Sequence, residues 1–260
     1  MMQREQRELR RRDVKARAAT LNEKFSFCRV LGCGKPSRAA TSDGLDMRYC
    51  RSHYEHSQSH GNPFKGSYRA KELNPYRQAA LQWMIEHEDE HWVRNATSNV
   101  NGLYRRAGEH VEAFRLTGLT PPDRAKAHWA RLRVHEVDTR LPVAAWIAVE
   151  MLIKDDPQPD GRREYKLVQA AKVIHRMASG SHRKWIREYS YGTRTKELHV
   201  YPRPRGRVLR SLGEDLESAA ELLADHHLAD IHAFKMERDK LGRFTSSPYP
   251  RGWSAKRRRA

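Results

Sequence analysis

All three cysteines of this chain lie in one short segment, between Cys28 and Cys50. An odd number of cysteines, in a sequence whose first twenty residues contain no apolar signal-peptide core, argues against a disulfide framework. We therefore expect a soluble, cytoplasmic protein whose thiols are reduced. No later stretch has the run of about 20 apolar residues that a membrane-spanning helix needs, so we expect no membrane association.

The cysteines and one histidine are spaced like the ligands of a structural zinc site. Cys28 and Cys33 enclose a short glycine-containing turn, which lets backbone N–H groups point at thiolate sulfurs. Cys50 and His53 are three residues apart, so they share one face of an expected helix. Three sulfurs and one imidazole nitrogen in a closed tetrahedron suit Zn²⁺. We predict a structural Zn²⁺ bound by Cys28, Cys33, Cys50 and His53.

The fourth ligand is the least constrained part of this prediction. His56 and His60 follow His53 closely, and either is an alternative ligand. The pattern is also compatible with three buried cysteines and a surface histidine that bind no metal. The concentration of every cysteine in one zinc-like pattern favours the metal site.

Residues 28–63 resemble the small zinc finger of many phage and mobile-element proteins, which often accompanies HNH-type endonucleases. The resemblance implies a treble-clef-like fold and a phage or mobile-element origin, in which case the protein acts in the host-cell cytoplasm. The loop between the ligand pairs is longer than usual, and no ββα-metal nuclease signature is adjacent, so the resemblance implies a module and not an activity. The matching residues are Cys28, Cys33, Pro36, Cys50, His53, Tyr54, His60, Gly61, Asn62 and Pro63.

Residues 87–91, with the sequence HEDEH, formally fit the H-E-x-x-H pattern of zinc proteases. An expected helix over 75–94 would place His87 and His91 on one face. Zinc-protease helices bury this motif, however, and burying Asp89, Glu90 and the neighbouring acids would be very costly. We therefore predict a solvated acidic face and no catalytic site. The histidine-rich sequence ADHHLADIH is interpreted in the same way, as part of a long amphipathic helix.

Apolar residues recur at helical spacing through most of the remaining chain, which predicts a mainly α fold. Residues 142–154 are apolar on nearly every side and should form the central helix of the core. Alternation near 194–202 predicts a short strand or β-hairpin. The expected domains are a basic arm at 1–22, a zinc module at 23–66, a helical domain at 72–240 and a basic tail at 241–260. The expected helices span 75–94, 99–116, 122–137, 142–154, 163–178 and 209–238.

The positive charge is concentrated in residues 162–210. The chain has 50 Lys and Arg against 32 Asp and Glu, a net charge of +18, and this basic strip alone contributes +11. Basic groups neutralise phosphates, and the interleaved rings can stack on bases. We expect nucleic acid as the partner, DNA in preference to RNA, with a helix N-terminus near residue 181 that faces phosphate. The residues expected to contact nucleic acid are Arg183, Lys184, Trp185, Arg187, Arg194, Lys196, Arg203, Arg205 and Arg207.

Together these features predict a zinc-containing nucleic-acid-binding protein. The sequence leaves open whether the chain is an enzyme, and it favours a binding protein. One alternative is a metal-dependent nuclease, or a related phosphoryl-transfer enzyme, with the finger as an accessory. Another is a structural or assembly protein that uses the finger for protein–protein contact. A basic, solvated surface with no nucleic-acid role is also compatible with the charge.

Overall fold

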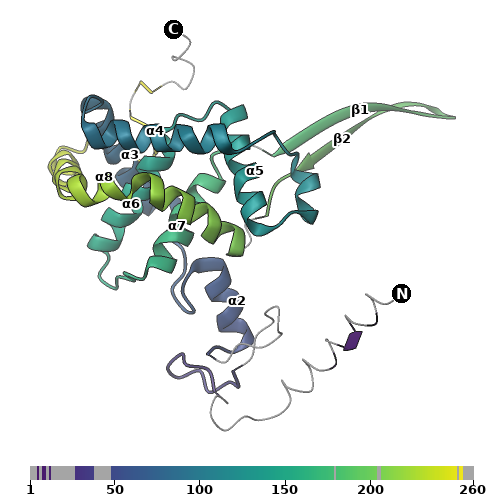
Figure 1. Ribbon diagram of the computed structural model, residues 1–260, viewed down its shortest axis with the longest axis horizontal. Coiled ribbons are helices and arrows are strands. Elements are labelled where there is room, and N and C mark those ends of the chain that lie inside the picture. Colours follow the sequence, from purple (N-terminus) through teal and green to yellow (C-terminus); the bar gives the residue numbers. More distant parts are fainter. Residues whose placement is uncertain are drawn as a thin grey trace. The chain divides into compact units, whose positions relative to one another are not determined.

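The structure is a computed structural model that divides into two compact units, Met1–Ser67 and Tyr68–Ala260 (Figure 1). Much of the predicted arm at 1–22 and the last seven residues of the predicted tail lie outside the described residues. Among the described residues, no helix has both the length and the apolar surface to cross a bilayer. The described residues are 27–37, 48–178, 180–203 and 206–250, together with Glu5, Glu8, Leu9, Arg12, Gly252 and Trp253.

In residues 27–37 and 48–67, the first unit contains a short turn and the helix α2 (Arg51–His60). The turn is closed by a bridge between Phe27 and Pro36 and by a hydrogen bond from Cys28 N to Lys35 O of 2.8 Å. Helix α2 ends at Gly61, whose positive φ of 78° is accessible to glycine at little cost. The described part of this unit therefore has the predicted order of a cysteine turn followed by a helix.

The second unit is mainly helical, which confirms the predicted fold class (Figure 1). The helices α3 to α7 are joined by short connections, and a long helix, α8, follows a two-stranded antiparallel hairpin. The elements are α3 (Ala70–Glu86), α4 (His91–Arg106), the 3₁₀-helix η1 (Ala113–Gly118), α5 (Pro121–Val134), α6 (Arg140–Asp155), α7 (Arg163–His175), β1 (Ser181–Tyr189), β2 (Gly192–Val200) and α8 (Gly206–Lys240).

Helix α6 is the centre of the core, as its apolar sequence predicts. Every residue from Arg140 to Val149 is buried, and α6 packs against α3, α7 and α8. The one charged residue in that run, Arg140, donates to the two carboxylate oxygens of Asp138 at 3.3 and 3.1 Å. Burial of this charge is therefore compensated by an ion pair.

The prediction of one helix over 75–94 is wrong, because α3 ends at Glu86 and α4 begins at His91. The Glu90 carboxylate accepts hydrogen bonds from Trp92 N at 2.6 Å and Val93 N at 3.1 Å, and so caps the second helix. A carboxylate at this position satisfies N–H groups that lack partners within the helix. The acids of the HEDEH sequence thus interrupt the helix instead of lining one face of it.

The prediction that a helix begins near residue 181 is also wrong. The sequence SHRKWIREY forms β1, which pairs with β2 from Ser181–Val200 to Tyr189–Gly192. The β-formers Trp185, Ile186 and Tyr189 favour a strand once a partner is available. The hairpin predicted near 194–202 is therefore confirmed, but its first strand comes from the segment that was expected to be helical.

A substitution at Gly213 tests the close packing of α7 against α8. A Cβ at this position would lie 2.6 Å from the carbonyl oxygen of Leu167, which is backbone and cannot rotate away. We expect Gly213→Ala to lower the free energy of unfolding by about 1–3 kcal/mol, measured by urea denaturation with tryptophan fluorescence. Gly161→Ala is the control, because its Cβ would meet nothing within 4 Å. Equal stability of the two variants would contradict this packing.

Two buried histidines, His128 of α5 and His175 of α7, stack with ring centroids 4.9 Å apart. Burial lowers the pKa of His128 to about 3 and that of His175 to about 4, from 6.5. The unfolded chain therefore binds more protons in this pH window, and stability should fall as the pH drops below 6.5. Between pH 7 and 5 we expect a loss of about 2 kcal/mol for each histidine.

The variant His128→Gln isolates one of these contributions. Glutamine keeps an N–H donor for Ile174 O, which His128 Nε2 contacts at 3.1 Å, but it does not titrate. Urea denaturation at pH 7 and pH 5 should show a smaller acid destabilisation in the variant. Identical pH dependence in both proteins would show that His128 is protonated in the folded state.

Candidate metal centre

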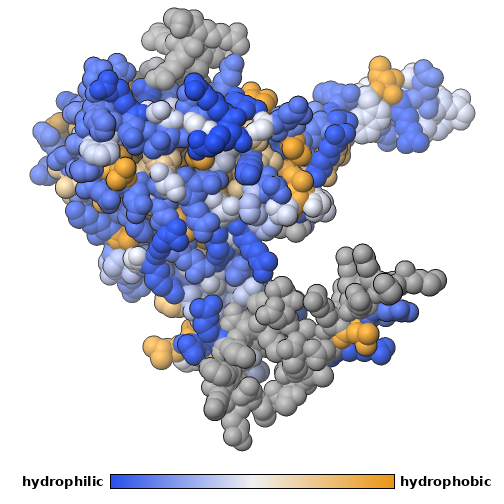
Figure 2. Space-filling view, viewed as in Figure 1, coloured by the Kyte–Doolittle hydropathy of each residue, from blue (hydrophilic) through white to orange (hydrophobic). Residues whose placement is uncertain are grey.

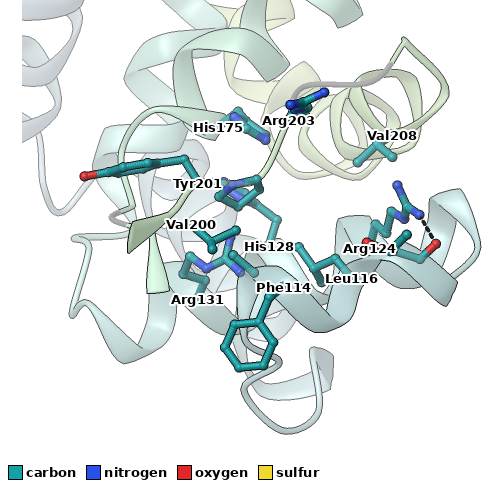
Figure 3. Close-up of a pocket in the computed structure, with 13 residues that line it drawn as sticks. Phe114, Leu116, Arg124, His128, Arg131, His175, Val200, Tyr201, Arg203 and Val208 are labelled. Atoms are coloured by element: carbon teal, nitrogen blue, oxygen red, sulfur yellow. Dashed lines mark hydrogen bonds between the residues drawn. The ribbon is translucent and has the colours of Figure 1, made fainter. Parts of the chain in front are cut away.

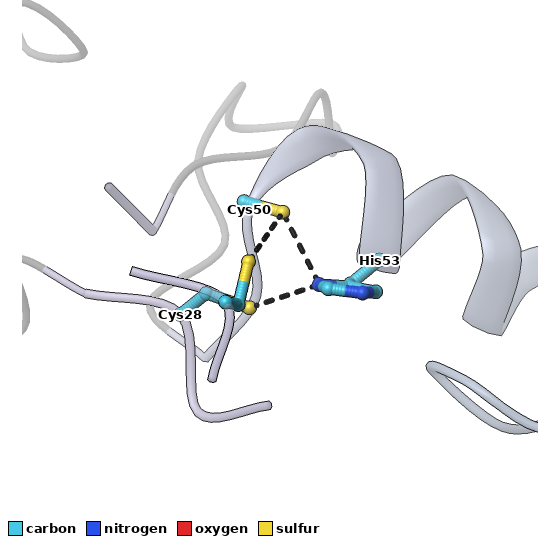
Figure 4. Close-up of side chains that lie close together, drawn as sticks. Cys28, Cys50 and His53 are labelled. Atoms are coloured by element: carbon cyan, nitrogen blue, oxygen red, sulfur yellow. Dashed lines mark hydrogen bonds between the residues drawn. The ribbon is translucent and has the colours of Figure 1, made fainter. Parts of the chain in front are cut away.

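The cysteine turn and the start of α2 bring four side chains together. Cys28 and Cys33 lie at the two ends of the turn, and a hydrogen bond from Cys33 N to Val30 O of 3.1 Å closes it. Cys50 is the N-cap residue of α2, and His53 lies one turn further along the same helix. The structure thus places the four predicted ligands next to one another (Figure 4).

The distances between these side chains fit a tetrahedral metal ion. Cys33 Sγ lies 3.8 Å from Cys50 Sγ, and His53 Nδ1 lies 3.3 Å from Cys28 Sγ and 3.4 Å from Cys50 Sγ. Tetrahedral Zn²⁺ requires about 3.8 Å between two sulfurs and about 3.5 Å between sulfur and nitrogen. All four ligand atoms lie within 4.8 Å of one another, and the cysteines form no disulfide. This cluster can therefore hold a metal ion.

The thiols differ in how readily they ionise. Burial disfavours the Cys50 thiolate, but hydrogen bonds from the backbone of His53 and from the other two thiols outweigh it and lower the pKa of Cys50. The backbone of Lys35 favours the Cys33 thiolate, but desolvation and the thiols of Cys28 and Cys50 raise the pKa of Cys33. A bound divalent cation would deprotonate all three thiols.

The two alternative histidines make other contacts. His56 Nδ1 donates to the backbone oxygen of Asn62 at 2.8 Å, and His60 Nδ1 lies 2.9 Å from Ser67 Oγ. The two imidazoles stack on each other with centroids 4.3 Å apart. Asn62 is buried, and its side-chain oxygen accepts from Phe64 N and Lys65 N at 2.8 and 2.7 Å. The His-Gly-Asn-Pro sequence therefore builds the turn that ends α2.

The HEDEH sequence is a turn between two helices. His87 ends α3 and stacks on Trp83 with centroids 4.2 Å apart, whereas His91 begins α4. The two histidines therefore do not share the continuous helix that a zinc protease uses.

In the ADHHLADIH sequence of α8, the His226 ring stacks on the Trp92 ring with centroids 4.3 Å apart, and His227 lies 3.2 Å from Glu90. These histidines join α8 to α4.

The residues predicted to contact nucleic acid fall into three groups. Arg183, Lys184, Trp185, Arg187, Arg194 and Lys196 lie on the hairpin. Arg203 follows β2, and Arg207 lies in the first turn of α8. Arg205 lies outside the described residues.

Two of the predicted phosphate contacts have acidic partners within the chain. Arg183 donates two hydrogen bonds to Glu112, at 2.9 and 2.5 Å, and its guanidinium lies over Phe114. Lys184 pairs with Glu197 of the facing strand at 2.5 Å. Arg183 thus attaches the base of the hairpin to the helical unit. No local pattern signals this role, because Glu112 is 71 residues away along the chain.

No family model matches this chain, and comparisons with curated proteins and with solved structures found no match.

Removal of one ligand should empty the metal site without unfolding the second unit. We expect about one zinc per chain in protein purified without chelator, measured by inductively coupled plasma mass spectrometry, and none in Cys50→Ala. Most of the helical circular dichroism should remain, since α3 to α8 form their own core.

His60→Ala is the matched control, because it removes a nearby imidazole that hydrogen-bonds to Ser67. This variant should keep its zinc, and His53→Ala should lose it. If His53→Ala keeps its zinc and His60→Ala loses it, His60 and not His53 is the fourth ligand.

Proposed function

We propose that this protein binds double-stranded DNA through the hairpin β1–β2, and that the Cys28–Cys33–Cys50–His53 cluster binds Zn²⁺ as a structural ion. The observation that carries the proposal is the division of charge between the two faces of the hairpin. Because side chains alternate along a strand and directly paired residues share a face, the register assigns each residue to one side.

One face of the hairpin is cationic and aromatic. It has four basic side chains, two rings and no acidic residue. The opposite face has one lysine, which is paired, and two glutamates. The cationic face consists of Arg183, Trp185, Arg187, Tyr189, Arg194, Lys196 and Leu198, and the opposite face of His182, Lys184, Ile186, Glu188, Thr193, Thr195, Glu197 and His199.

The cationic face places like charges directly against each other. Arg187 pairs with Arg194 across the strands, an arrangement that destabilises a sheet. Tyrosine rings disperse part of this charge: the Arg187 guanidinium lies 5.3 Å from the Tyr189 ring, and that of Arg194 lies 5.3 Å from Tyr191. No described carboxylate pairs with Arg187, Arg194 or Lys196. A polyanion laid along this face would remove the repulsion and release counterions.

The shape of the hairpin supports duplex DNA as the partner. The two strands project from the helices as a narrow ribbon (Figures 1 and 2). Strands of nine residues extend about 30 Å. The major groove of B-form DNA, about 12 Å wide, admits a two-stranded ribbon. The major groove of A-form RNA is too narrow for side chains to enter, which favours DNA over RNA.

The Cys28–Cys33–Cys50–His53 cluster of the first unit has a supporting role in this proposal. Three thiolates and one imidazole suit Zn²⁺, and the separations of the ligand atoms agree with its bond lengths. The resemblance of residues 28–63 to the small zinc fingers of phage and mobile-element proteins supports a treble-clef-like module and an origin among such proteins. The endonucleases that such fingers accompany act on DNA, which agrees with the charge of the hairpin.

Neutralising the unpaired cations of the hairpin should weaken DNA binding. We expect the triple variant Arg187→Ala, Arg194→Ala, Lys196→Ala to bind a 20-base-pair duplex more weakly than the native chain. The slope of log K against log salt should fall by about 0.9 for each phosphate that is no longer neutralised, or about 2.7 for three. Fluorescence anisotropy at several salt concentrations measures both quantities.

The matched control removes three exposed cations from the helices, with Arg94→Ala, Lys126→Ala and Lys154→Ala. It has the same net charge as the hairpin variant, but its hairpin cations are intact, so it should keep most of the affinity. An equal decrease in both variants would mean that binding follows net charge and not the hairpin. No binding by the native chain at low salt would overturn the proposal in favour of a structural or assembly protein.

The same preparation tests the alternative of a metal-dependent nuclease. Supercoiled plasmid incubated with Mg²⁺ or Mn²⁺ should stay intact if the chain only binds DNA. Nicking that co-purifies with the native chain and is absent without the cation would establish the enzyme instead.

A further inference from the structure

A cavity of about 410 Å³ lies at the base of the hairpin, within the second unit (Figure 3). It is bounded by η1, α5, the C-terminal end of α7 and the segment that leads from β2 into α8. This volume falls within the range of small-molecule sites, about 300–1,000 Å³. The cavity is lined only by residues of the second unit, and none of the cations of the hairpin strands lines it.

Three arginines and no carboxylate line this cavity: Arg124, Arg131 and Arg203. Arg131 is only 1% exposed, and its Nη2 donates to Val111 O at 3.2 Å. Its Nε has no hydrogen-bond partner among the described residues. A buried guanidinium without a counter-charge is costly, because the charge loses hydration and gains little in return. An anion in the cavity would offset this charge.

The other polar groups of the cavity do not replace that anion. His128 Nε2 lies 3.1 Å from Ile174 O and therefore donates to it. Burial, and the charge of Arg131, lower the pKa of both His128 and His175, so the two imidazoles are neutral at pH 7. Burial also lowers the pKa of Arg131.

The remaining lining is apolar and partly aromatic. Phe114, Leu116 and Val208 contribute hydrocarbon surface, and Tyr201 contributes a second ring (Figure 3). Guanidinium groups bind phosphate oxygens in pairs, and aromatic side chains stack on planar rings. The lining therefore suits a molecule that carries both a phosphate and a planar ring.

We propose that this cavity binds a nucleoside monophosphate, with its phosphomonoester on Arg131 and Arg203 and its base against Tyr201. The source is either a free nucleotide or the 5′-phosphorylated end of a DNA strand, which share this chemistry. The inference does not depend on duplex binding by the hairpin, because it stands on the uncompensated charge of Arg131 and not on the hairpin face.

Isothermal titration calorimetry with adenosine 5′-monophosphate tests this site in the full-length protein. We expect binding by the native chain, and an affinity at least about tenfold lower for adenosine, which lacks the phosphate. Arg131→Gln should weaken nucleotide binding by about tenfold or more. The hairpin variant Arg187→Ala, Arg194→Ala, Lys196→Ala should bind the nucleotide like the native chain.

Arg203→Ala covers the case in which Arg131→Gln fails to fold, because Arg203 is exposed and its removal leaves no buried gap. It should also weaken nucleotide binding, whereas Arg207→Ala, an exposed neighbour that does not line the cavity, should not. Competition by a 5′-phosphorylated single-stranded oligonucleotide, but not by its unphosphorylated form, would identify a strand end as the source. Lack of competition would identify the free nucleotide.

Three results would overturn the site: no nucleotide binding by the native chain, equal affinity for adenosine, or unchanged affinity in both arginine variants. Each can occur whether or not the hairpin binds duplex DNA, so failure here is distinguishable from failure of the proposed function.

Discussion

The burial of residues 140–149 of α6 on all sides is the constraint on which the helical unit depends. A helical segment with no exposed face must be covered by neighbours in every direction, and α3, α7 and α8 supply that cover. Trp146 and Met151 are almost fully buried among them. Each of the surrounding helices packs one apolar face toward this core, and the hairpin contributes no residue to it.

The hairpin consequently depends on the pairing of its two strands and on the contacts at its base. Two strands alone in water are only marginally stable, so the contacts at the hairpin base matter. Ser181 Oγ accepts from Ala113 N at 2.8 Å in a buried contact, and Arg183 pairs with Glu112 beside it. Beyond Arg183 the strands are largely exposed. The anionic partner proposed above would relieve the repulsion between Arg187 and Arg194 in this exposed ribbon.

Features that depend on local spacing could be predicted from the sequence. Four ligands at fixed separations identified the metal cluster, and a run of apolar residues identified α6. Prediction failed where a partner segment outside the local pattern decided the outcome. The sequence SHRKWIREY has no strict alternation of apolar and polar residues, and it becomes a strand because residues 192–200 supply its hydrogen bonds.

Two other features have weak or absent local signals in the sequence. The spacing of the HEDEH sequence predicts Glu90 to be one more acid on a helix face, although it caps the helix that follows. Arg131 and His128 interrupt an otherwise apolar face of α5, and periodicity alone does not show which groups from η1 and α7 complete the cavity beside them.

The hairpin and the cavity share the same supports. Residues 112–117 attach β1 through Glu112 and Ala113, and they line the cavity through Phe114 and Leu116. Val200 ends β2 and also lines the cavity. Because packed side chains transmit small displacements, a group that fills the cavity acts on the same residues that fix the base of the hairpin. The base of the ribbon and the lining of the cavity therefore share one small cluster of residues.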